Sequence, residues 1–205
     1  MFGSAPIVGV PYELGKDCEL SCTSDRWGDY PMTGIAETWD DCTGSFASTA
    51  LMKRGFTVLL AEDSEDDVFF FSRALEESAE RVNVPIRLEV TRDGREALAY
   101  LNGEGEFGDR RKYPFPEIVV TDLKMPLVNG LEVLAWLKEH EEYHRVPKIL
   151  LSGSCEEHDV DEAYRLGVNT YFQKPSSPGD YRELVYHIVC YWVHTERPVI
   201  RHPAL

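Results

Sequence analysis

The stretch IVVTDLKMP, residues 118–126, ends an apolar run on one carboxylate, Asp122, and the Met-Pro pair of residues 125 and 126 follows it. A continuous apolar run of this kind is typical of a parallel strand that is covered on both faces. In α/β sheets the carboxyl ends of such strands open onto the crevice where ligands bind. The stretch therefore predicts that Asp122 lies at the rim of a ligand crevice.

Similar apolar runs lie on both sides of this stretch and alternate with segments of helical spacing. The expected strands are residues 56–63, 86–91, 117–122, 148–153 and 170–173. The expected helices are residues 64–81, a short helix after Asp93 and Gly94 that ends near Leu101, and residues 130–142, 156–167 and 178–192. Right-handed crossovers then place helices on both faces of one sheet. This predicts an α/β, flavodoxin-like, doubly wound five-stranded parallel sheet with strand order 2-1-3-4-5.

Three regions are expected along the chain. Residues 1–54 lack sustained periodicity and form an irregular or disordered N-terminal extension, residues 55–195 form the α/β domain, and residues 196–205 form a C-terminal tail. Its aromatic residues, among them Trp27, Tyr30, Trp39 and Phe46, could dock on another surface or be incidental to a flexible extension. It also contains Cys18 and Cys22, half of a zinc site for which no second pair of ligands follows at a suitable distance.

The charge balance excludes several classes of partner. The chain of 205 residues has 21 basic and 36 acidic residues, a formal net charge of −15, which makes nucleic acid and anionic membranes poor partners. Five cysteines without a repeated spacing do not indicate a secreted disulfide framework. With neither a spanning segment nor a secretory signal in the sequence, a cytoplasmic location is expected.

A second group of acids is expected beside Asp122. Glu62 and Asp63 end the first strand, which the predicted order makes a neighbour of the third strand. Three converging carboxylates need a partner of opposite charge, and Mg2+ suits such an oxygen site. A carboxylate can also act as a nucleophile toward a phosphoryl group. The acids that follow, Glu65, Asp66 and Asp67, are expected only to favour the positive end of the first helix dipole.

Two later strand ends complete this site. Ser152 ends the fourth strand and could donate its hydroxyl to a phosphoryl oxygen. Lys174 follows the fifth strand and could bring an ammonium to the same charge, while Pro175 keeps its backbone extended.

These residues, in this order and at these strand ends, resemble the receiver domain of two-component response regulators, and TDLKMPLVNG, residues 121–130, is similar to the family's phosphorylation loop. The resemblance implies that Asp122 accepts a phosphoryl group from a histidine kinase or phosphotransfer protein. It also implies that Asp63, Asp122 and the backbone carbonyl of Lys124 hold Mg2+, with Glu62 contributing its charge and a bound water.

The same resemblance implies a switch. Ser152 moves toward the phosphoryl group and Tyr171 turns inward. The face formed by the fourth helix, fifth strand and fifth helix then changes shape. This face is also the expected surface for a homodimer and for a downstream protein target. Lys124 and Ser154 flank the path of attacking water and tune dephosphorylation. The long loop of residues 102–116 and the sequence YWV near Pro198 also resemble regulators paired with bacterial phytochromes.

Alternatives to this interpretation remain. A haloacid-dehalogenase-type phosphatase also forms an aspartyl phosphate, but its D-x-D motif belongs on the first strand, where Glu65 stands two residues after Asp63. A pseudo-receiver would be a protein-binding module that is not phosphorylated. The sequence shows no helix-turn-helix pattern or basic stripe, so output through protein contacts rather than DNA is expected. The expected role is a phosphoacceptor that promotes its own phosphorylation and dephosphorylation rather than a classical enzyme.

Overall fold

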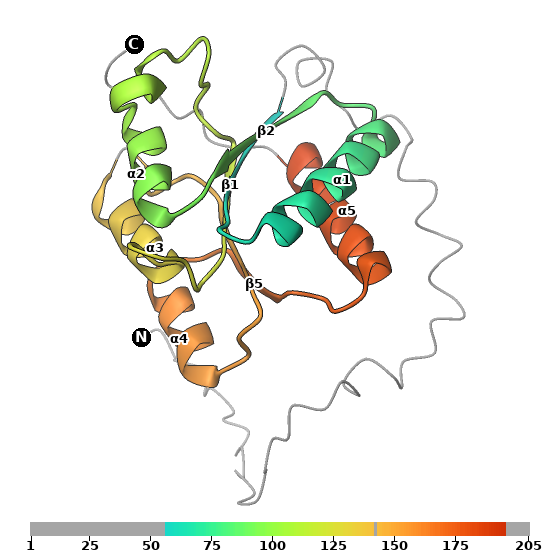
Figure 1. Ribbon diagram of the computed structural model, residues 1–205. Coiled ribbons are helices and arrows are strands. Elements are labelled where there is room, and N and C mark those ends of the chain that lie inside the picture. The colour runs from blue at the N-terminus through green and yellow to red at the C-terminus, as the bar shows by residue number, and fades with distance from the viewer. Residues whose placement is uncertain (1–55, 142, 196–205) are drawn as a thin grey trace, which may run out of the picture. The chain divides into compact units, whose positions relative to one another are not determined.

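Five parallel strands form the central sheet of the computed structural model, which describes residues 56–141 and 143–195 (Figure 1). The strands are β1 (Phe56–Ala61), β2 (Ile86–Thr91), β3 (Ile118–Thr121), β4 (Lys148–Ser152) and β5 (Thr170–Gln173). Their order is β2-β1-β3-β4-β5, which confirms the predicted topology. The predictions for residues 1–54, including Cys18 and Cys22, and for residues 196–205 lie outside the described residues.

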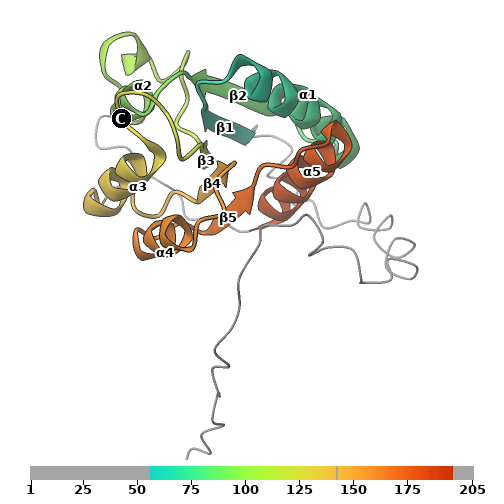
Figure 2. The same cartoon turned by 60° about the horizontal axis from the view of Figure 1, so that its bottom comes forward.

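Helices cover both faces of the sheet. They are α1 (Glu65–Val82), α2 (Gly94–Asn102), the short 3-10 helix η3 (Gly105–Gly108), α3 (Gly130–Glu139), α4 (Glu157–Arg165) and α5 (Pro178–His194). Helices α1 and α5 lie side by side on one face, and α2, α3 and α4 lie on the other, as both views show (Figures 1 and 2). Because each strand is followed by a helix that crosses the sheet, this two-sided cover is the expected result of right-handed connections.

Side chains from alternate positions of β1 supply the cores on the two faces. Val58 and Leu60 pack with Phe71 of α1 and Val185 of α5 in one core cluster. Leu59 packs in another cluster with α2 and α3 residues. Successive residues of a strand point to opposite faces, so a strand with both faces covered must be apolar throughout.

Local signals in the sequence set where the helices begin. Side chains of Ser64, Asp93, Asn129 and Ser177 each accept a hydrogen bond from a backbone N–H in the first turn of α1, α2, α3 and α5. Such caps satisfy N–H groups that have no partner within the helix. The end of α3 differs from the prediction, because the helix stops at Glu139 rather than near residue 142. The extended backbone of His140, the residue that caps it, breaks the helical path.

Strand register determines which side chains meet at the carboxyl end of the sheet. Ala61 of β1 pairs with Thr121 of β3, so the next residues along each strand leave the sheet side by side. In the same way Ser152 of β4 pairs with Gln173 of β5, the residue before Lys174.

Within the described part of the chain, no helix has the length and apolar character needed to cross a membrane.

Candidate functional site

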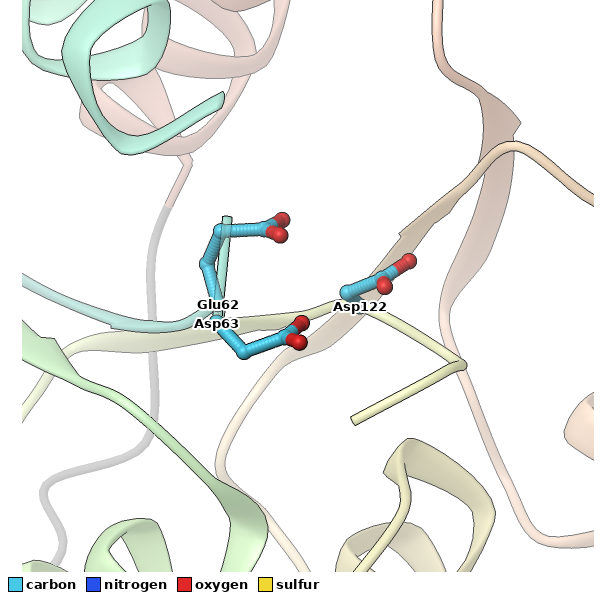
Figure 3. Close-up of side chains that lie close together, drawn as sticks. All are labelled: Glu62, Asp63 and Asp122. Carbon is cyan, nitrogen blue, oxygen red and sulfur yellow. The ribbon is translucent and has the colours of Figure 1, made fainter. Parts of the chain in front are cut away.

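Three carboxylates gather where β1 and β3 end. Figure 3 shows the side chains of Glu62 and Asp63 extending toward the side where Asp122 lies. Each offers a carboxylate oxygen that lies within 4.8 Å of the others. The β1–β3 pairing continues one step past the strands, since the Asp122 N–H donates a hydrogen bond of 2.9 Å to the Ala61 carbonyl. The structure therefore brings together the three acids that the sequence analysis expected to converge.

The loop after β3 is tightly folded around Asp122. Its carboxylate Oδ2 accepts a hydrogen bond of 3.2 Å from the Lys124 backbone N–H. Helix α3 then begins at Gly130, where a Cβ atom would lie only 2.2 Å from the Asp122 carbonyl oxygen. Glycine is thus required for the helix to start so close to the loop, because any side chain there would collide with backbone.

Lys174 lies among these acids. Its ammonium donates hydrogen bonds of 2.7 Å to Glu62 Oε2 and 2.7 Å to Asp67 Oδ2, and it lies 3.5 Å from Asp122 Oδ1. The Lys174 backbone N–H donates to the Ser152 carbonyl at 2.8 Å, which anchors the residue to the end of β4. The sequence interpretation placed Lys174 in the site, and the structure brings it there.

Asp67 is the residue that sequence reasoning assigned incompletely. It lies in the first turn of α1 as expected, yet its carboxylate also contacts Lys174. The neighbouring acids of that turn, Glu65 and Asp66, are exposed. The sequence carried no local signal that distinguishes Asp67 from these neighbours, because the orientation of α1 decides which acid of its first turn meets Lys174.

Burial dominates the electrostatics of the acids. Glu62 is 2 % exposed, and burial raises its pKa to about 7 even though the hydrogen bond and charge of Lys174 oppose the rise. Burial also raises the pKa of Asp122, which is 7 % exposed, against the opposing charge of Lys174. Burial alone would lower the pKa of Lys174, but its hydrogen bonds to Asp67 and Glu62 outweigh burial and raise it.

The donor set fits a hard divalent cation. Glu62, Asp63 and Asp122 supply only carboxylate oxygens, which Mg2+ prefers together with retained waters. Exposed acids often cluster without a metal, but two of these three are buried. Burying like charges together is costly unless protons, a lysine or a metal ion offset their repulsion.

A chain of hydrogen bonds links Ser152 to the loop before α4. The Ser154 N–H donates to Ser152 Oγ at 3.1 Å, and the Ser154 carbonyl accepts a hydrogen bond of 3.0 Å from the Tyr171 hydroxyl. The Ser154 hydroxyl in turn donates to Asp159 Oδ2 at 2.7 Å. Ser152, Ser154 and Tyr171 therefore form one connected group, and Asp159 extends it into α4.

Comparison with known proteins agrees with this geometry. Residues 58–186 match the model of the response regulator receiver domain. The chain is 34% identical over 138 residues to the response regulator Rcp1 of Synechocystis sp., a match covering 67% of this chain and 89% of Rcp1.

Solved structures give the same result. The phosphorylated cyanobacterial phytochrome response regulator RcpA matches with a TM-score of 0.64 and 32% identity, covering 71% of this chain and 99% of RcpA. The Mn2+-bound form of Rcp1 matches with a TM-score of 0.62 and 32% identity, covering 70% of this chain and 99% of that structure. On the fold, the acidic cluster and these matches, the chain belongs to the response regulator receiver domain family.

Proposed function

We propose that this protein is a two-component response regulator that accepts a phosphoryl group on Asp122 and signals through altered protein contacts. The observation that carries the proposal is the convergence of Glu62, Asp63, Asp122 and Lys174 at one end of the sheet. Receiver domains are signalling proteins that interact with histidine kinases or phosphotransfer proteins. Membership of that family supports the same kind of phosphoryl donor here.

In the proposed transfer, a carboxylate oxygen of Asp122 forms a bond to phosphorus as the phosphorus–nitrogen bond of a phosphohistidine breaks. The electron pair of that bond stays with the imidazole nitrogen. Asp63, Asp122 and the Lys124 backbone carbonyl would hold Mg2+, with Glu62 contributing its charge and a bound water, and the ion would supply positive charge to the phosphoryl oxygens. The Lys174 ammonium and the Ser152 hydroxyl would donate to the same oxygens.

The connected group at Ser154 supports a route for the signal. When the Ser152 hydroxyl turns toward the phosphoryl group, the Ser154 N–H loses its acceptor, and the contact between Ser154 and Tyr171 has to adjust. This would change the loop before α4 and the face of α4, β5 and α5, as a local change in charge biases a two-state element. Lys124 and Ser154 would flank the path of the attacking water and tune the later dephosphorylation.

The same face is proposed as the contact surface for a second copy or a downstream target. Tyr164 of α4 and Tyr191 of α5 are large aromatic residues that are 51% and 63% exposed. Exposed aromatic side chains are enriched at protein interfaces. Sedimentation of the protein before and after phosphorylation tests this, and an unchanged monomer in both states would contradict the dimer.

The likeness to RcpA, a phytochrome response regulator, supports a histidine kinase of the phytochrome class as the phosphoryl donor. Incubation with such a kinase, autophosphorylated beforehand, should move the label to this chain and not to the Asp122→Asn variant. Labelling by unrelated kinases at the same rate would contradict that assignment of the donor.

Intact mass after incubation with acetyl phosphate and Mg2+ tests the central proposal. We expect a gain of one phosphoryl group, about 80 Da, on the native protein and no gain on Asp122→Asn. Asp161→Asn, the same change at an exposed position of α4, is the matched control and should label normally. Absence of label on the native protein with every donor and metal would leave a pseudo-receiver that acts as a binding module.

A further inference from the structure

The Lys174 ammonium is held by one carboxylate that does not belong to the acidic cluster. Asp67 Oδ2 lies 2.7 Å from Lys174 Nζ, as close as Glu62, whereas Asp122 Oδ1 lies 3.5 Å away. The cluster that could hold a metal ion consists of Glu62, Asp63 and Asp122. Asp67 therefore acts on the lysine from outside that cluster.

An acid at the start of α1 can stabilise the helix without contacting Lys174. Glu65, Asp66 and Asp67 all lie in the first turn, where any acid favours the positive end of the helix dipole. The helix cap is also independent of the Asp67 side chain, because Ser64 Oγ accepts from the Asp67 backbone N–H. The hydrogen bond between Asp67 and Lys174 is thus an additional feature of one acid among three.

The donors of Lys174 are limited. An ammonium has three N–H groups, and hydrogen bonds to Glu62 and Asp67 use two of them. A phosphoryl group on Asp122 would carry roughly two negative charges in place of the single charge of the carboxylate, and its oxygens would compete for the hydrogen bonds of this ammonium. Glu62 is buried and cannot move far, but the side chain of Asp67 is 30% exposed and can turn toward solvent.

We propose that Asp67 is a positioning residue that restrains the Lys174 ammonium toward α1 and thereby opposes the phosphorylated state. This inference rests on the proposed function of Asp122 as phosphoacceptor. In the unphosphorylated protein Asp67 stabilises the lysine in its present position and offsets part of its charge. Phosphorylation then weakens the contact with Asp67, so its removal favours the phosphorylated protein.

The test compares Asp67→Asn with Asp66→Asn in the full chain. Both variants remove one negative charge from the first turn of α1, but only Asp67 contacts Lys174. At a limiting concentration of acetyl phosphate with Mg2+, we expect the ratio of phosphorylated to unphosphorylated protein to rise about threefold in Asp67→Asn. Asp66→Asn should change it much less, and Asp67→Glu, which keeps the charge, should restore most of the native value.

Thermal unfolding of each variant excludes a general loss of structure, and Asp67→Ala gives a second neutral side chain should the amide itself bind Lys174. Equal ratios for Asp67→Asn, Asp67→Ala and Asp66→Asn would overturn the role of Asp67 while leaving the phosphoacceptor intact. A lower ratio in the neutral Asp67 variants would overturn it as well, since it would make the contact favourable for phosphorylation. Absence of label on the native chain would instead overturn the proposed function.

Discussion

Two lysines, Lys148, which is buried, and Lys174, which is half-buried, lie at opposite ends of the sheet and have different hydrogen-bond partners. Lys148 begins β4 and is 5% exposed, and its ammonium donates to the carbonyl oxygens of His144 and Val146 at 2.7 and 3.1 Å. Lys174 follows β5, and its ammonium donates to the carboxylates of Glu62 and Asp67. Burial lowers the pKa of Lys148, whereas the acids raise the pKa of Lys174 despite burial.

The difference suggests separate roles for the two ends of the sheet. We call the end at Lys148 the structural end, and the end at Lys174, where a bound ion or phosphoryl group would change the charge balance, the responsive end. The carbonyl partners of Lys148 belong to the chain that enters β4, and they carry no charge that a ligand could displace. The partners of Lys174 are charged groups beside the proposed phosphoacceptor, where an added anion or cation changes the balance. The same side chain can thus support a loop at one end and respond to charge at the other.

Replacing Lys174 by methionine should give the largest effect on phosphorylation. The variant loses the ammonium that would donate to the phosphoryl oxygens, and a hydrogen bond to a charged group contributes about 1.5–3 kcal/mol. We expect the rate constant of labelling by acetyl phosphate, followed by intact mass, to fall roughly ten- to hundredfold. Lys148→Met is the matched control and should label at the native rate when folded.

If Lys174→Met were labelled at the native rate, the proposed difference between Lys174 and Lys148 would be wrong, because Lys174 would then have only a structural role. The stability of Lys174→Met provides a second test. At pH 6 this variant should unfold at nearly the same urea concentration as the native protein. Glu62 can take up a proton there, since its pKa is already raised to about 7. A large loss of stability at that pH would show that the ion pair acts mainly to hold the fold.

The pH dependence of stability should differ between the two ends. Glu62 has a pKa of about 7 in the folded protein and an ordinary value of 4.5 when unfolded. Between these values the folded protein binds more protons, so without divalent cations stability falls as pH rises from 4.5 to 7, by on the order of 1–3 kcal/mol. Lys148 has a lowered pKa when folded, so the unfolded chain binds more protons below 10.5 and stability rises with pH there.

Urea unfolding in a metal chelator at several pH values measures both slopes. Glu62→Gln should remove the fall between pH 4.5 and 7, and Lys148→Met should remove the rise at alkaline pH. A fall that persists in Glu62→Gln would assign the titration to another group. Mg2+ should oppose the fall in the native protein, because a bound cation favours the ionised carboxylates.

The sequence predicted the responsive end better than the structural one. Lys174 could be assigned because a short strand precedes it, Pro175 follows it, and Asp122 and Ser152 end other strands of the same sheet. Each of these signals is local, and the parallel topology brings them to one edge. The family resemblance covers the same positions, and five strands in the predicted order confirm the fold.

Tertiary structure decided what the sequence could not show. Lys148 is the first residue of an apolar strand. Its burial depends on the path of residues 144–146, which brings the carbonyl oxygens of His144 and Val146 to its ammonium. Asp67 could not be distinguished from Glu65 and Asp66 by composition, because only the phase of α1 decides which acid meets Lys174. The long loop after α2 is likewise ordered by Arg110, which donates to the carbonyl oxygens of Tyr100 and Leu101.

Replacing Lys148 by methionine should give the smallest effect and sharpen the comparison. The variant leaves the His144 and Val146 carbonyls without their donor, which costs stability, but it also removes a buried charge and adds apolar contact. These changes partly cancel, so we expect the free energy of unfolding in urea at pH 7 to fall by about 1 kcal/mol. The control is Lys138→Met on the exposed side of α3, which removes one exposed hydrogen bond to the Arg165 carbonyl and should cost less. If folded Lys148→Met lost phosphorylation by acetyl phosphate, the assignment of separate roles to the two ends of the sheet would be wrong. The loop before β4 would then influence Asp122 at the opposite end of the sheet.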